Sequence, residues 1–146
     1  MEIRFKKLNI FYLFQLYFFL KKHQEDKYNF NPHEYSLKKI IQNMISKDVY
    51  IIQLYKDKIV GYGMLRGWSE GYKIPTLGII INNEYRGLGL SKIMMTYLHF
   101  LAKQKKSEKV LLKVKKSNSI AINLYKKFNY ELSNYNDEFL IGQKIL

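Results

Sequence analysis

Hydrophobic residues along this chain of 146 residues follow helix-like spacing in some segments and strand-like runs in others. The clearest helix starts at Leu90, where apolar side chains recur at i, i+3, i+4, i+7, i+8, i+11 and i+12. These side chains are Leu90, Ile93, Met94, Tyr97, Leu98, Leu101 and Ala102. The pattern predicts a helix over 90–105 with one apolar face, which a sheet must cover.

The other segments complete a mixed α/β (α+β) pattern within one domain, 1–146. We predict strands over 3–8, 48–54, 58–66, 74–81, 109–115, 130–132 and 139–146, and further helices over 10–23, 32–45 and 118–128. The dipeptide Lys56-Asp57 indicates a tight hairpin turn, and Pro32 is acceptable in a first helical turn. The last two strands can pair antiparallel and close the sheet.

The apolar run 10–20 (IFYLFQLYFFL) raises the question of a membrane segment. Its length falls short of the ~20 residues that a spanning helix needs. It also lacks the small-residue cleavage site of a signal peptide. We therefore expect this run to be the first helix, packed on the sheet of a cytoplasmic protein without membrane insertion.

Charge and composition exclude several kinds of chemistry. The net charge of +13 could serve nucleic acid, anionic lipid or an anionic substrate, but its lysines are spread along the chain. We interpret the charge mainly as solvated surface and expect no nucleic-acid partner. Because cysteine is absent, a disulfide framework, a zinc–thiolate site and an acyl-cysteine intermediate are excluded. His23, His33 and His99 lack metal-ligand spacing, so we predict no metal site.

The segment 76–91 (TLGIIINNEYRGLGLS) carries the strongest chemical signal. A strand runs into a loop with Gly87 and Gly89, and this loop opens directly onto the helix. Such a junction directs free backbone N–H groups and the positive helix end at one place, which suits a phosphate. The loop does not contain a P-loop motif, and it fails the dinucleotide fingerprint because Lys92 stands where glycine is required.

Two motifs resemble those of the GCN5-related N-acetyltransferases. Residues 86–91 (RGLGLS) resemble the acetyl-CoA signature R-x-x-G-x-G/A, with the small residue Ser91, a good helix cap, at its last position. Residues 118–130 (NSIAINLYKKFNY) resemble N-x-x-A-x-x-L-Y-x-x-x-G-F/Y. Asn129 replaces the motif glycine, and asparagine tolerates the left-handed conformation that a helix exit needs. Ser117 or Asn118 can cap this helix.

The resemblance implies an acyltransferase that moves an acetyl group from acetyl-CoA, its cosubstrate, directly to a primary amine. It implies that the strands 74–81 and 109–115 splay apart to admit the pantetheine arm. Tyr125 occupies the position of the general acid. The implied cofactor-binding residues are Leu77, Ile79, Ile81, Arg86, Gly87, Leu88, Gly89, Leu90, Ser91, Asn118 and Tyr125.

The general base does not follow directly from the motif. Lys73 lies near the position where many relatives have glutamate, and lysine at its normal pKa cannot serve as the base. Glu70 is the nearest carboxylate and our candidate, whereas Glu84 lies beside the phosphate loop and is expected to tune or cap it. A base acting through ordered water, or proton loss to solvent, stays open.

The acceptor pocket is expected to include Phe30, His33, Arg66, Trp68 and Tyr72. The surrounding segments 30–33 and 64–72 resemble those of small acetyltransferases encoded with surface-polysaccharide genes. This resemblance implies a small-molecule amine, with an amino-sugar nucleotide as an example. The alternatives are a protein or peptide amine, and a non-catalytic basic module that binds nucleic acid. A homodimer through an exposed C-terminal edge strand is a further expectation.

Overall fold

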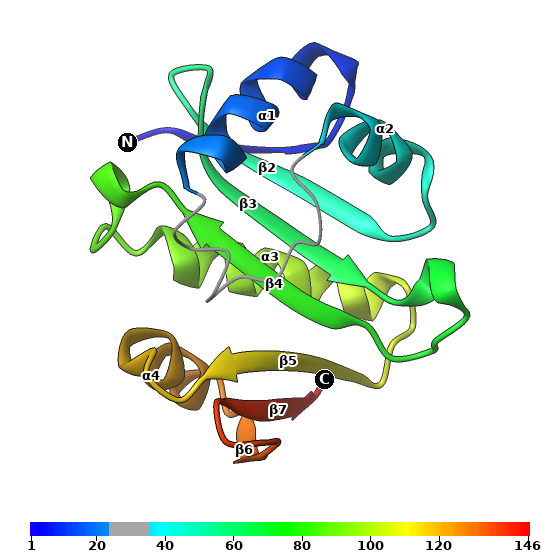
Figure 1. Ribbon diagram of the computed structural model, residues 1–146, viewed down its shortest axis with the longest axis vertical. Coiled ribbons are helices and arrows are strands. Elements are labelled where there is room, and N and C mark those ends of the chain that lie inside the picture. The colour runs from blue at the N-terminus through cyan, green and yellow to red at the C-terminus, as the bar shows by residue number, and fades with distance from the viewer. Residues whose placement is uncertain (24–35) are drawn as a thin grey trace.

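The computed structural model describes residues 1–23 and 36–146 (Figure 1). Its strands are β1 (Ile3–Lys7), β2 (Val49–Tyr55), β3 (Lys58–Arg66), β4 (Thr76–Ile81), β5 (Lys109–Lys115), β6 (Glu131–Asn134) and β7 (Phe139–Ile145). Its α-helices are α1 (Leu13–Lys22), α2 (Leu37–Ile45), α3 (Leu90–Gln104) and α4 (Ser119–Lys127), and the short 3-10 helices are η1 (Ile10–Tyr12), η3 (Trp68–Glu70) and η4 (Asn83–Tyr85). The described strands form one mixed sheet in the order β1-β2-β3-β4-β5-β7-β6, which confirms the predicted fold class.

Helices cover both faces of the sheet and divide the core into two layers (Figure 1). On one face, α1 and α2 contribute Leu16 and Ile40, which pack with Ile52 and Tyr62 of the sheet. On the other face, the apolar sides of α3 and α4 pack against Leu65, Leu77 and Leu112. The predicted helix 90–105 therefore buries the face that its spacing indicated.

The sheet opens between β4 and β5, as predicted. β4 pairs with β3 over its full length, from Thr76 to Ile81. With β5 it shares a single parallel pair, Thr76 with Leu111. The Leu111 N–H donates to the carbonyl of Pro75 at 2.9 Å, so the two strands are joined at the start of β4 only. Toward Ile81 the facing backbone edges of β4 and β5 are not paired with each other, and a ligand can enter between them.

Backbone conformations confirm two local predictions. Lys56 and Asp57 both have positive φ, of 47° and 60°, as the central residues of a type I′ hairpin turn require. Asn129 has φ of 62° at the exit of α4, which is the left-handed conformation expected there.

Some boundaries differ from the prediction. α2 starts at Leu37, because the side chain of Ser36 accepts a hydrogen bond from the Lys39 N–H and caps the helix there. The predicted start at Pro32 lies outside the described residues. None of the helices in 1–23 and 36–146 has both the length and the apolar character needed to cross a membrane.

Candidate functional site

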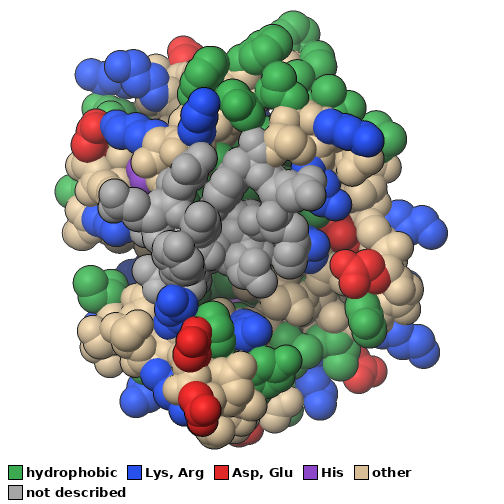
Figure 2. Space-filling model, viewed as in Figure 1, with side chains coloured by type: hydrophobic (Ala, Val, Ile, Leu, Met, Phe, Trp, Pro, Cys, Tyr) green, Lys and Arg blue, Asp and Glu red, His purple; other side chains and the backbone are tan. Residues whose placement is uncertain are grey.

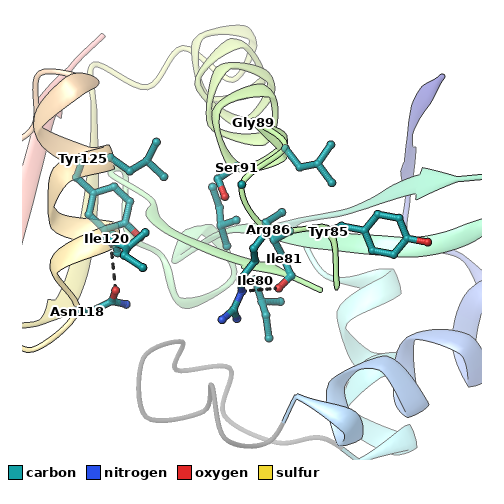
Figure 3. Close-up of a pocket in the computed structure, with 14 residues that line it drawn as sticks. Ile80, Ile81, Tyr85, Arg86, Gly89, Ser91, Asn118, Ile120 and Tyr125 are labelled. Carbon is teal, nitrogen blue, oxygen red and sulfur yellow. Dashed lines mark hydrogen bonds between the residues drawn. The ribbon is translucent and has the colours of Figure 1, made fainter. Parts of the chain in front are cut away.

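A cavity of about 370 Å³ lies where β4 separates from β5, between the end of β4 and α4 (Figure 3). Its wall is formed by the end of β4, the glycine loop, the first turn of α3 and one side of α4. The lining residues are Ile79, Ile80, Ile81, Tyr85, Arg86, Gly87, Gly89, Leu90, Ser91, Asn118, Ile120, Ala121, Leu124 and Tyr125. Both motifs found in the sequence therefore face one space.

The glycine loop needs its glycines for backbone conformation. Gly87 and Gly89 have φ of 80° and 79°, a region that residues with a Cβ atom rarely adopt. A Cβ atom at either position would meet no protein atom within 4 Å, so the loop borders open space. Gly89 caps α3, and Ser91 occupies the second helical position instead of the cap. The first N–H groups of α3 have no acceptor within the helix and are available to an anion.

Arg86 and Glu84 hold the loop in place. The Arg86 Nε group donates to the carbonyl of Ile81 at 3.3 Å, across the end of β4 (Figure 3). Glu84 pairs with Lys22 of α1 at 2.7 Å, and this hydrogen bond lowers the pKa of the Glu84 carboxyl. Glu84 therefore ties the loop to α1, consistent with a role beside the phosphate loop.

On the other wall, α4 presents Asn118 and Tyr125. The Asn118 Oδ1 atom accepts a hydrogen bond from the Ala121 N–H at 3.2 Å, which identifies Asn118 as the cap and leaves its Nδ2 group to donate (Figure 3). Tyr125 is buried at the cavity wall, and burial raises the pKa of its hydroxyl to about 12. The hydroxyl therefore keeps its proton at neutral pH.

Behind Tyr125 lies a buried polar pair. The His99 Nε2 atom and the Tyr130 hydroxyl are 2.7 Å apart, and the rings of Tyr130 and Tyr125 have centroids 5.8 Å apart. The backbone N–H of Tyr130 also donates to the Tyr125 carbonyl. Burial, with Lys144 and Lys103 nearby, lowers the pKa of His99 to about 4, so its ring is neutral at pH 7.

This pair predicts a loss of stability in mild acid. The unfolded chain takes up a proton at His99 below about pH 6.5, whereas the folded chain does so only near pH 4, so stability falls across that window. Between pH 7 and pH 5 the wild-type protein should lose about 1–2 kcal/mol more free energy of unfolding than His99→Gln. Denaturant unfolding of both proteins at the two pH values measures the difference. Equal losses of unfolding free energy in the two proteins would contradict the conclusion that His99 is buried in its neutral form.

The sequence profile of the acetyltransferase (GNAT) family matches residues 10–130. The chain belongs to this family. It is accordingly an acyltransferase, and both motifs of the cavity fall within the matched region.

Solved structures of other proteins share this fold. The PaiA N-acetyltransferase from Thermoplasma acidophilum, in complex with coenzyme A, superposes with a TM-score of 0.85 at 16% identity, with 100% of each chain covered. The smu.2055 protein from Streptococcus mutans superposes with a TM-score of 0.81 at 24% identity, with 99% of each chain covered. A ribosomal-protein-alanine N-acetyltransferase from Brucella melitensis superposes with a TM-score of 0.82 at 16% identity, with 100% of each chain covered. No curated protein matches the chain significantly in sequence.

Most of the predicted cofactor residues of this GNAT protein line the cavity. They are Ile79, Ile81, Arg86, Gly87, Gly89, Leu90, Ser91, Asn118 and Tyr125. The side chain of Leu77 is buried in the layer under α3, and that of Leu88 is exposed. Either residue can therefore contribute through its backbone. The sequence analysis missed the lining residues Ile80, Tyr85, Ile120, Ala121 and Leu124, although the last three belong to the second motif or its helical spacing.

The predicted acceptor residues lie elsewhere. Arg66 pairs with Thr76, so the loop after β3 is at the end of β4 opposite the glycine loop, roughly 17 Å away at 3.3 Å per residue. This loop carries Trp68, Glu70 and Tyr72, and none of the three lines the cavity. Phe30 and His33 lie outside the described residues.

The loop at this far end is fixed by hydrogen bonds to the start of β2. One carboxylate oxygen of Asp48 accepts from the N–H groups of Gly67 and Ser69, both at 3.0 Å. The ammonium group of Lys105 lies 4.7 Å from the Trp68 ring. Trp68 packs partly buried against the layer under α3. In the described part of the chain, no three His, Asp or Glu side chains gather closely enough to hold a metal ion.

Proposed function

We propose that this GNAT enzyme transfers the acetyl group of acetyl-CoA directly to a primary amine of a small molecule. One observation carries the proposal. The glycine loop, Asn118 and the buried Tyr125 converge on one cavity, at the point where β4 and β5 separate. The residues present fit the cosubstrate, because the cavity is open beside Gly87 and Gly89 and faces the free N–H groups at the start of α3.

The two walls of the cavity contact different parts of acetyl-CoA in this proposal. N–H groups from Gly87 to Ser91 hold the pyrophosphate, since the backbone N–H of Arg86 donates to the Asn83 carbonyl, and the Arg86 guanidinium adds its charge beside them. The Asn118 Nδ2 group donates to the cosubstrate. Backbone groups of Leu77, Ile79 and Ile81 pair with the pantetheine arm as a neighbouring strand would. The amine nitrogen bonds to the thioester carbon as the carbon–sulfur bond breaks. Tyr125 then gives its proton to the leaving thiolate, while the base takes a proton from the amine.

We propose Glu70 as that base, acting through water because it does not line the cavity. Its side chain is well exposed and lies 4.0 Å from Arg66, so it can pass a proton to solvent. Glu70→Gln should lower kcat/KM roughly 10- to 100-fold, at the low end for a general base. Steady-state kinetics from pH 6 to 9 measure the effect. Wild-type kcat/KM across this range would exclude Glu70.

The acceptor is proposed to be an amine that also carries phosphate, such as an amino-sugar nucleotide. The Nε group of Arg66 is buried and finds no hydrogen-bond partner among residues 1–23 and 36–146, which suits a residue that receives an anionic ligand. Trp68 or Tyr72 would stack on the base or sugar, and Phe30 and His33 would complete the pocket. The alternative acceptor is a protein amine, the substrate named for the Brucella relative.

Thermal unfolding with and without acetyl-CoA is the first test. At a ligand concentration of a hundred times Kd, binding stabilises the fold by about 2.7 kcal/mol, a rise of several degrees for a chain of this size. Amino-sugar nucleotides and peptide amines are then compared as acceptors by release of free thiol. Absence of any thermal shift at millimolar acetyl-CoA would overturn the proposal in favour of a non-catalytic basic module.

Two further predictions concern the state of the protein in the cell. β6 forms one edge of the described sheet and can pair with the same strand of a second copy, giving a homodimer. We also propose a cytoplasmic enzyme.

A further inference from the structure

The helix α1 is apolar on two opposite sides. Its inner side buries Leu13, Leu16 and Leu20 against the sheet. Its outer side carries an aromatic stripe, which starts in η1 and consists of Phe11, Phe14 and Phe18. These side chains are 90%, 62% and 62% exposed. A helix that covers a sheet normally turns polar residues outward, so the stripe is not explained by the fold of a single chain.

The stripe is part of a larger apolar surface. Ile10 precedes it in η1, and Ile41 and Ile45 are exposed on the neighbouring helix α2. Figure 2 shows hydrophobic side chains gathered at the top of the molecule, where Figure 1 places α1 and α2. Contiguous exposed apolar groups of this kind indicate a surface that is covered by something else.

Basic residues predominate in the segments that carry this surface. The described residues of 1–23 and 36–47 contain eight Lys and Arg and one acidic residue, Glu2. With 24–35 included, the sequence 1–47 keeps a net charge of +5. Lys6 and Lys21 lie 5.7 Å and 5.8 Å from the rings of Tyr12 and Tyr17. Two of the eight basic groups are paired with carboxylates, Lys22 with Glu84 and Arg4 with Asp57. Lys21 lies one helical turn beyond Phe18, so charge adjoins the stripe.

We propose that α1 docks this GNAT enzyme on the surface of an anionic lipid bilayer. Phenylalanine side chains enter the boundary between headgroups and acyl chains, while the flanking lysines attract anionic headgroups. A second copy fits the surface poorly, because two such faces would bring like charges together. Docking of this kind leaves the helix in the plane of the interface, which agrees with its being too short to span.

Vesicle flotation tests the proposal. The full chain should float with vesicles of equal parts phosphatidylglycerol and phosphatidylcholine and stay behind with phosphatidylcholine alone. The double variant Phe14→Ser/Phe18→Ser should lower the partition coefficient by about tenfold or more. Phe100→Ser is the matched control, because Phe100 is 53% exposed on α3, and it should stay within about twofold of wild type. High salt should weaken binding, since it screens the lysines.

Each alternative outcome contradicts the proposal. Absence of flotation with the anionic vesicles would exclude docking on an anionic bilayer. Equal binding by the double variant would show that charge alone is responsible. Light scattering that reveals a dimer in wild type and a monomer in the double variant would assign the stripe to a second copy. The rise in unfolding temperature with acetyl-CoA must persist in Phe14→Ser/Phe18→Ser and in Phe100→Ser. This result separates the test of membrane docking from the test of the proposed function.

Discussion

Gly89→Glu is expected to abolish the rise in unfolding temperature that acetyl-CoA produces in the wild-type protein. The Cβ position of Gly89 points into open space beside the cavity, where the cosubstrate pyrophosphate is proposed to lie. A carboxylate there occupies that space and repels the phosphates at the positive end of α3. Differential scanning fluorimetry at several acetyl-CoA concentrations measures the effect.

Gly71→Glu is the matched control for this variant. Gly71 has φ of 90°, and a Cβ atom there would also meet no atom within 4 Å, but the residue does not line the cavity. Both variants should unfold earlier than wild type without ligand, because both force a side chain into a left-handed conformation. Only Gly71→Glu should retain the acetyl-CoA shift. A retained shift in Gly89→Glu would place the pyrophosphate elsewhere.

Tyr125→Phe is expected to lower kcat roughly 10- to 1000-fold, the contribution typical of a general acid. The hydroxyl is the only group removed, and the ring still fills its place against Tyr130. Because the pKa of Tyr125 is raised to about 12, wild type carries the proton over the whole working range of pH. KM for acetyl-CoA should change little, since the loop and the β4 backbone are untouched.

Tyr130→Phe is the control that tests whether loss of any buried tyrosine hydroxyl lowers kcat. Tyr130 is also a buried tyrosine, and its hydroxyl bonds to His99 instead of lying at the cavity wall. This variant should lose stability yet keep kcat within about threefold of wild type, well short of a lost general acid. A Tyr125→Phe enzyme with kcat within a factor of two of wild type, at unchanged fold, would exclude the acid role.

The sequence predicted the local backbone of the glycine loop and of α4 well, because short-range requirements define it. Gly87 and Gly89 adopt positive φ in the loop, Asn129 does so at the end of α4, and Asn118 caps that helix. Such features depend on neighbours within a few residues, and these can be read from the chain itself. The splay of β4 from β5 followed from the family resemblance, and the structure confirms it.

The acceptor side could not be predicted in the same way. Glu70 lies only six residues before Thr76, yet the pairing of Arg66 with Thr76 places it at the end of β4 away from the glycine loop. The order of the chain places the loop that carries Glu70 before β4, but it does not reveal whether the side chains of the loop turn toward the cavity. The apolar run 10–20 forms the predicted helix packed on the sheet, but its sequence did not reveal that packing covers only one of its two apolar sides.

The single pair between Thr76 and Leu111 also affects the cooperativity of the whole molecule. Strands β1–β4 and strands β5–β7 form two leaves, each held by its own antiparallel ladder and linked across the sheet mainly at that one point. Beyond that pair the leaves are joined by side-chain packing under α3, where Leu65 and Leu77 of one leaf lie in the same core layer as Leu112 of the other. A cosubstrate held by the β4 backbone and by Asn118 of α4, as proposed, would add a second link between the leaves. The thermodynamic coupling between them is therefore expected to rise when the site is occupied.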